Sequence, residues 1–276
     1  MAKAELGVAA VQLNSQADVG QNLERCRELC RRARARGAEL VLLPENFAFF
    51  GAEVDKRQLA ESVEDGVIMS ALREMARENA VTVIGGGFPE RSADPARPHN
   101  TLVVVGADGS LVASYRKVHL FDVELGSGGS YAESAATSPG SSVVVVEVEG
   151  FKLGLSICYD LRFPELYRAL SEQGAEVLLV PAAFTLHTGK DHWHVLLRAR
   201  AIEAQAFVVA AAQHGTHPGS RSTYGHSLVV DPWGTVIAEA SDGVGLVCAT
   251  LERSRLDSVR RSLPSLAHRK LGLGLA

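Results

Sequence analysis

The segment GLSICYDLRFPELYRAL, residues Gly154 to Leu170, changes character near its middle. It opens as an apolar run typical of a buried strand and closes with the spacing of an amphipathic helix. Cys158 stands at the change, so we expect a strand-to-helix elbow that presents its thiol. Because unpaired N–H groups at a helix start stabilise a thiolate, we predict a lowered pKa for Cys158. The alternative is a small buried hydrophobic residue in a core strand, the usual place of a free cysteine.

The composition of the chain indicates a large core. Its 276 residues are 46% hydrophobic, and we expect one domain over residues 1–276, with a core over residues 4–250 and a C-terminal tail over residues 251–276. The formal net charge of −4 provides no basic surface for nucleic acid or anionic lipid, so neither is an expected partner. The sequence contains no long apolar segment typical of a secretory leader or a membrane span, which predicts a cytoplasmic protein.

Strand patterns alternate with helical patterns on both sides of this segment. We expect strands over residues 6–13, 39–43, 81–84, 101–105 and 111–115, and helices over residues 22–36, 66–79, 163–173 and 193–205. The second half of the chain repeats the first in three places: LGVAAVQL from Leu6 resembles LGLSICYD from Leu153, GAELVLLPENF from Gly37 resembles GAEVLLVPAAF from Gly174, and TLVVVGADGSLVASY from Thr101 resembles SLVVDPWGTVIAEA from Ser227.

The repeats predict two similar β-α-β-α-β-β halves related by a pseudo-twofold axis. Nearly continuous apolar strands need cover on both faces, so we expect an α/β fold of four layers, an α-β-β-α sandwich with the two sheets packed together. The alternative is a chance resemblance between apolar α/β units. In this alignment Cys158 stands opposite Val11 and Glu45 opposite Ala182. Polar groups present in only one copy are therefore candidates for function.

Three reactive side chains follow predicted strands: Glu45, Lys117 and Cys158. Ends of sheet strands are where α/β proteins place their chemistry. Glu45 can take the thiol proton and return it to a leaving amine, the thiolate can attack a carbonyl carbon, and Lys117 with the N–H of Tyr159 can hold the oxyanion. Taken singly, Glu45 could instead cap a helix and Lys117 could be a surface charge.

Three motifs resemble those of the nitrilase superfamily of carbon–nitrogen hydrolases: PENF at residues 44–47, YRKVHLFD at residues 115–122 and CYDLRFPELYR at residues 158–168. The resemblance covers nearly the whole chain. It implies a catalytic triad of Glu45, Lys117 and Cys158, and a second glutamate, Glu133, that orients the lysine. It also implies a homodimer or a larger homo-oligomer.

The same resemblance implies that the pair Arg162 and Glu165 forms a salt bridge that shapes the elbow rather than contacting substrate. One departure is visible in the loop over residues 126–130, which lacks the proline usual in the superfamily. That difference concerns the entrance to the site and leaves the triad positions intact.

Four further motifs resemble the branch of the superfamily that hydrolyses deaminated glutathione: DHWHVLLRARAIEAQ, AAAQHGTH, YGHSLVVDPWGTV and LPSLAHRK. This resemblance implies a thiol amidase that acts through a thioester and needs no cofactor. The alternatives are an omega-amidase acting on alpha-keto-glutaramate, a nitrilase or carbamoylase of the same superfamily, and a binding protein without turnover.

Two further segments could contact the substrate. The first is Phe184 and the segment that follows it, with Thr188 and His192, which could line the pocket. The polar segment over residues 213–224, which contains Arg221, could line an opening for a leaving peptide. Solvated surface loops are the alternative in both places.

Metal and nucleotide sites are not expected. Besides His192, the helix region contains His187 and His194, but residues two apart on a helix point to nearly opposite sides, so His192 and His194 could not easily share an ion. The glycine run at residues 85–87 follows a strand but lacks the residues of a phosphate-binding loop, and close backbone packing explains it better.

Overall fold

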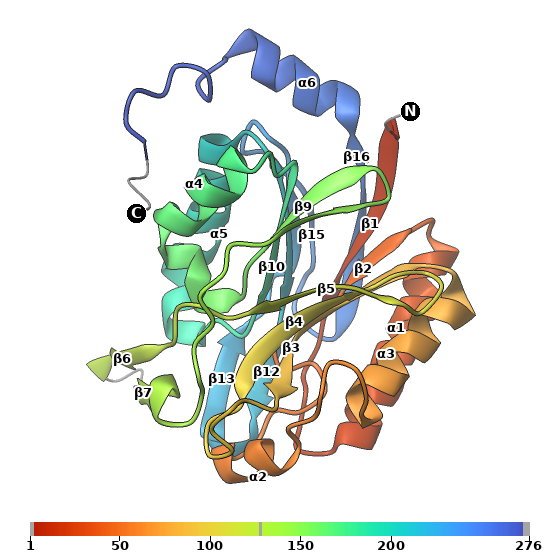
Figure 1. Ribbon diagram of the computed structural model, residues 1–276, viewed down its shortest axis with the longest axis vertical. Helices are drawn as coiled ribbons and strands as arrows, with labels where there is room; N and C mark the ends of the chain where they lie inside the picture. The colour runs from red at the N-terminus through yellow and green to blue at the C-terminus, as the bar shows by residue number, and fades with distance from the viewer. Residues whose placement is uncertain (1–2, 127–128, 273–276) are drawn as a thin grey trace.

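The computed structural model describes residues 3–126 and 129–272, and the chain forms two six-stranded sheets packed face to face (Figure 1). The first has the strand order β16-β1-β2-β3-β4-β5, with β1 at Glu5–Gln12, β2 at Leu40–Leu42, β3 at Thr82–Glu90, β4 at His99–Val105, β5 at Leu111–Arg116 and β16 at Gly245–Glu252. The second has the order β15-β14-β11-β10-β9-β8, with β8 at Val145–Val148, β9 at Phe151–Leu155, β10 at Val177–Ala182, β11 at Phe207–Ala212, β14 at Leu228–Val230 and β15 at Val236–Glu239.

Helices cover the outer faces of both sheets (Figure 1). The first sheet is covered by α1 (Val19–Ala35) and α3 (Val67–Asn79), and the second by α4 (Pro164–Glu172) and α5 (Leu186–Ala204). Successive residues of β1 enter different cores: Val8 and Ala10 join the second sheet in one core, whereas Ala9 and Val11 pack beneath α1 and α3. This burial on both faces explains the continuous apolar strands. The predicted four-layer sandwich is confirmed.

The two halves of the chain share one topology, as the pseudo-twofold predicts. In the first half β1, β2 and β3 run parallel while β4 and β5 return antiparallel. In the second half β9, β10 and β11 run parallel while β14 and β15 return antiparallel. An antiparallel edge strand completes each sheet, β16 beside β1 and β8 beside β9.

The register of the sheets corrects the alignment of the two halves. Val8 of β1 and Leu153 of β9 take equivalent places beside the next strand. The predicted alignment of these strands is therefore wrong by two residues, and Cys158 corresponds to Leu13 rather than to Val11. A shift of two leaves every side chain on the same face of its strand, so the apolar pattern fits both alignments equally well.

Helix α5 begins well before Trp193, where the sequence predicts its start. The side chain of Thr185 caps the helix by accepting the N–H of Thr188. Gly189 in the first turns packs against Tyr224, where any larger side chain would collide with the tyrosine. The first turns of α5 are polar because they contact a neighbouring ribbon rather than the core, so they lack the apolar period that marks a helix in sequence.

Short elements surround this sandwich: the ribbons β6 (Asp122–Glu124) with β7 (Ser130–Ala132) and β12 (His214–His217) with β13 (Arg221–Tyr224), the helices α2 (Glu53–Gln58) and α6 (Arg253–Ser262), and the 3₁₀ turns η2 (Glu133–Ala135), η3 (Cys158–Arg162) and η4 (Pro218–Ser220). Helix α6 follows β16 directly and buries Leu256 and Val259, so ordered structure continues past residue 250 into the expected tail. In the described ranges, no helix combines the length and apolar character that crossing a membrane requires.

Candidate active site

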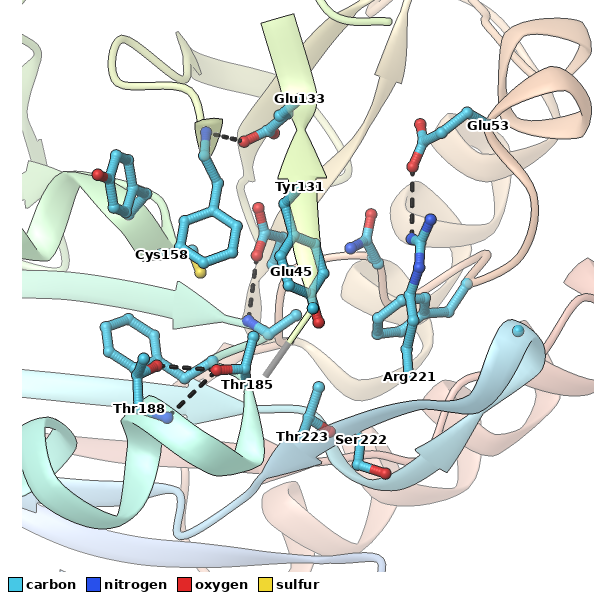
Figure 2. A pocket seen from close by; sticks show the side chains of 18 of the residues that line it. Glu45, Glu53, Tyr131, Glu133, Cys158, Thr185, Thr188, Arg221, Ser222 and Thr223 are labelled. Carbon is cyan, nitrogen blue, oxygen red and sulfur yellow. Dashed lines mark hydrogen bonds and ion pairs between the residues drawn. The ribbon is translucent and has the colours of Figure 1, made fainter. Parts of the chain in front are cut away.

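A cavity of ≈ 530 Å³ opens beside the ends of β2, β5 and β10 (Figure 2). Glu45, Lys117, Glu133 and Cys158 all line it. Glu45 follows β2, Lys117 follows β5, Cys158 begins η3 after β9, and Glu133 begins η2 after the β6–β7 ribbon. The sandwich thus brings together side chains that are far apart in the chain.

Lys117 lies between the two carboxylates and is almost completely buried. Its Nζ donates to Glu45 Oε1 at 2.9 Å and to Glu133 Oε2 at 2.9 Å. Burial alone would lower the pKa of Lys117, but the charges of Glu133 and Glu45 outweigh it and hold that pKa well above its usual value. Nζ also donates to Glu133 Oε1 at 3.1 Å. Lys117 therefore stays charged, and all three of its hydrogen bonds go to the two glutamates.

Glu45 is held by three donors. Its Oε1 accepts from Lys117 and from Asn100 Nδ2 at 2.9 Å, while its Oε2 accepts the N–H of Ala183 at 3.0 Å. Burial by itself would raise the pKa of Glu45, but the charge and hydrogen bond of Lys117 lower it below its ordinary value, with a further contribution from the thiol of Cys158. Glu45 is therefore an ionised carboxylate that can accept a proton.

Cys158 forms the expected elbow, with φ at +48° in the left-handed region. The predicted lowering of its pKa is wrong for the resting protein. Burial and the neighbouring charge of Glu45 raise the pKa of Cys158 well above its usual value, although Lys117 and the N–H of Ala183 oppose this. Cys158 begins a 3₁₀ turn of five residues rather than a long helix. The helix dipole that the predicted lowering of the pKa relied on is therefore weak. The thiol stays protonated beside its base.

Sequence reasoning missed the residue that fixes the elbow, Asp160. This fully buried carboxylate accepts the N–H of Ile157 at 2.9 Å and the hydroxyl of Tyr115 at 2.8 Å. It also accepts the backbone N–H of His119 at 3.0 Å. Because Tyr115 and His119 flank Lys117, Asp160 ties the segment that carries the thiol to the segment that carries the ammonium. The sequence feature that could have identified Asp160 is its position two residues after Cys158 in the Cys-Tyr-Asp motif.

A family model described as carbon-nitrogen hydrolase matches residues 7–261 of this sequence. The chain belongs to this family. It is 48% identical over 264 residues to a protein named deaminated glutathione amidase from Synechocystis, a match that covers 95% of this chain and 97% of that one.

Two solved structures are similar to this hydrolase. The C. elegans NitFhit protein has a TM-score of 0.92 and 39% sequence identity, and the match covers 99% of this chain and 68% of that one. A mutant of the amidase from Nesterenkonia sp. AN1 has a TM-score of 0.79 and 29% identity, with 95% of this chain and 99% of that one covered. That structure is described as showing Michael addition of acrylamide at the active site cysteine.

The remaining candidate residues of this carbon–nitrogen hydrolase divide into two groups. Tyr159, Phe184, Thr188 and Arg221 line the cavity. His192 is not among the described residues that line it. Of the loop over residues 126–130, residues 127 and 128 lie outside the described ranges.

Arg162 occupies a different place from the one its motif implies. The described residues contain no ion pair between Arg162 and Glu165. Instead Arg162 lines the cavity, with its guanidinium 5.1 Å from the centre of the Phe184 ring and 6.0 Å from that of Tyr159. Nη1 of Arg162 lies 3.2 Å from Nδ1 of His192. Arg162 is thus available to the cavity rather than committed to a structural salt bridge.

The β12–β13 ribbon contributes Arg221 to the opposite wall. Arg221 Nη1 lies 3.4 Å from Oε1 of Glu53 on α2 (Figure 2). His217 of the same ribbon is buried outside the cavity lining, stacked on Phe50 at 4.0 Å. Together these contacts fasten the ribbon to α2 and to the segment that precedes it. Sequence reasoning missed α2 altogether, including the cavity-lining Lys56, because a short charged segment is indistinguishable from solvated surface.

The helical histidines have separate partners, as the helix period predicts. His192 contacts Arg162, whereas Nε2 of His194 lies 2.8 Å from Oε1 of Glu239. His226 Nδ1 approaches the same carboxylate oxygen at 2.9 Å. These last three residues form a group whose ligand atoms lie within 4.8 Å of one another. None of the three lines the active-site cavity.

Proposed function

We propose that this chain is a thiol amidase that hydrolyses deaminated glutathione to 2-oxoglutarate and Cys-Gly, without a metal or cofactor. The observation that carries the proposal is the convergence of Glu45, Lys117, Glu133 and Cys158 on one cavity. The similarity to proteins named deaminated glutathione amidase supports the choice of substrate.

Acylation begins with transfer of the thiol proton of Cys158 to Glu45 as the sulfur attacks the amide carbon. The positive charge of Lys117 and the N–H of Tyr159 stabilise the oxyanion. Glu45 then passes the proton to the amide nitrogen, the carbon–nitrogen bond breaks and the dipeptide leaves with its amine restored. The acyl group remains on sulfur as a thioester.

Deacylation uses the same groups, with water in place of the thiol as the nucleophile. Glu45 takes a proton from water while the hydroxide oxygen attacks the thioester carbon, and Lys117 holds the oxyanion again. The carbon–sulfur bond breaks, and the proton on Glu45 returns to the sulfur of Cys158. Glu133 acts as a positioning residue, because its carboxylate fixes Lys117 and keeps it charged throughout.

The charges of the cavity fit a substrate with a carboxylate on its acyl half. Arg162 lines the cavity against the rings of Tyr159 and Phe184 and has no carboxylate partner in residues 3–126 and 129–272. We assign it to the carboxylate of the oxo acid, since a guanidinium and a carboxylate form strong charge-assisted hydrogen bonds.

The test of the substrate is a comparison of two amides. We expect kcat/KM for deaminated glutathione to exceed that for alpha-keto-glutaramate by at least about tenfold, or roughly 1.4 kcal/mol in transition-state binding. Equal values, or a preference for alpha-keto-glutaramate, would assign the chain to the omega-amidases. Absence of amine release from any short amide, nitrile or carbamoyl compound would indicate a binding protein.

The assembly we propose is a homodimer, or a larger oligomer built on dimers, in the cytoplasm. On α5, Val195 and Ile202 are 66% and 47% exposed, whereas Trp193 and Leu197 on the other face are fully buried. Packing of α5 against a second copy would cover this apolar face. Light scattering at micromolar concentration is the test, because a mass near 29.4 kDa would mean a monomer. Cell fractionation tests the location.

A further inference from the structure

Helix α2 places the unpaired ammonium of a mostly buried lysine in the wall of the active-site cavity, counted over the described residues. Lys56 lines the cavity and is only 9% exposed. Within the part of the chain that the structure describes, its Nζ forms neither a hydrogen bond nor an ion pair. The side chain is mostly covered, and its ammonium faces the cavity that Lys56 lines. Lys56 is therefore placed to pair with a negatively charged group that enters the cavity.

Two other cations of the cavity, Lys117 and Arg221, already pair with carboxylates of the protein. Lys117 is held by Glu45 and Glu133. Arg221 approaches Glu53, which lies one helical turn before Lys56 on α2. The one acidic side chain of α2 that lines the cavity is thus directed to the ribbon and away from Lys56. In residues 3–126 and 129–272 no carboxylate forms an ion pair with Lys56, so its ammonium can pair with the carboxylate of a ligand.

The charges also indicate which half of a substrate Lys56 faces. Burial raises the pKa of Glu45, and the charges of Lys117 and, more weakly, Lys56 lower it. Lys56 and Glu45 also line the same cavity. Glu45 gives its proton to the leaving amine, so the leaving group must lie beside it. Arg162, in contrast, lies against the ring of Tyr159, the residue next to Cys158, where the acyl group is attached.

We propose that Lys56 binds the terminal carboxylate of the leaving peptide. The inference rests on the proposed amidase function and names the group that recognises the far end of its substrate. An extended dipeptide spans about 7 Å from its nitrogen to its terminal carboxylate, which gives the leaving group the reach to place one end at Glu45 and the other at a neighbouring ammonium. A charge-assisted hydrogen bond then forms between that carboxylate and the Lys56 ammonium.

The experiment compares deaminated glutathione with its analogue in which the glycine carboxylate is a carboxamide. Binding of each compound is measured by calorimetry in a Cys158→Ala background, so the readout does not depend on turnover. With Lys56 present, we expect the acid to bind at least about tenfold more tightly than the carboxamide. In Lys56→Met that preference disappears, and Lys56→Arg, which keeps the charge, retains part of it. Lys190→Met removes an exposed lysine that does not line the cavity and should retain the full preference.

Two results would overturn the assignment: an equal preference for the acid in Lys56→Met and in its parent, or equal binding of the two compounds when Lys56 is present. Turnover separates this inference from the proposed function. If the acid is preferred through Lys56 but the active protein does not cleave it, the carboxylate site stands and the proposed amidase reaction fails. In the active protein, loss of Lys56 also changes the electrostatics at Glu45, but that effect acts on both compounds and cancels in their ratio.

Discussion

The two halves of the sandwich carry different side chains at equivalent positions of their strands. The segment after β2 reads Leu-Pro-Glu-Asn and its counterpart at the end of β10 reads Val-Pro-Ala-Ala, so Glu45 corresponds to Ala182 and the next residue to Ala183. The side chain of Glu45 accepts the N–H of Ala183. One copy therefore supplies the carboxylate and the other supplies a donor that holds it. The two halves share one scaffold, and the active site arises from side chains that differ between them.

The largest effect should follow removal of the nucleophile, a residue that only the second half carries. Cys158→Ala and Cys158→Ser should both lose at least about 10⁴-fold in kcat/KM and retain the wild-type circular dichroism spectrum. An alkoxide is far harder to form than a thiolate at this site. Iodoacetamide should inactivate the enzyme as it labels Cys158. Inactivation with label on Cys26 or Cys30, and none on Cys158, would refute the assignment.

Replacement of the carboxylate tests the difference between the halves directly. Glu45→Gln keeps the shape but removes the proton acceptor, and should cost about 10²–10⁴-fold in kcat. The matched control is Ala182→Ser at the equivalent position of the second half, which adds a polar atom without a route for the proton. We expect it to keep kcat within about threefold of wild type. Comparable losses in both variants would mean that packing, rather than the carboxylate, sets the rate.

The pH dependence of kcat/KM should show how the partners of Glu45, which come from both halves, lower its pKa. Its pKa lies below the ordinary 4.5, and the reaction needs the ionised form. On acidification kcat/KM should therefore hold through neutral pH and fall only below about pH 4.5, where Glu45 takes up a proton. Circular dichroism at each pH excludes acid unfolding. An acid limb between pH 6 and 7 would instead indicate a histidine as the base.

The smallest effect should come from the wall of the cavity. Arg221→Ala removes a half-exposed ion pair with Glu53, and such pairs contribute up to about 1 kcal/mol. We expect the preference for deaminated glutathione over alpha-keto-glutaramate to narrow by at most about fivefold, as measured by the ratio of kcat/KM values. An equal loss on both amides would show that Arg221 supports the catalytic centre and not the peptide side.

The sequence predicts the layers, the pseudo-twofold and the elbow because apolar periodicity and repeat order express them directly. It could not predict the register of β1 against β9, since a shift of two residues preserves the face of each side chain. It also could not predict the direction of the pKa shift of Cys158, which depends on burial and on Glu45, a residue far away in the chain. Lys56 was missed for the same reason, because its burial is set by tertiary contacts.

The protonated resting state of Cys158 has a consequence for the life of the enzyme in an oxidising environment. Peroxides and disulfides react with thiolates, and a neutral buried thiol is a slow target for them. A hydrolase that processes a glutathione derivative would meet such oxidants alongside its substrate. By generating the anion only while a proton acceptor and a substrate carbonyl are both in place, the site shields its nucleophile from irreversible damage between turnovers.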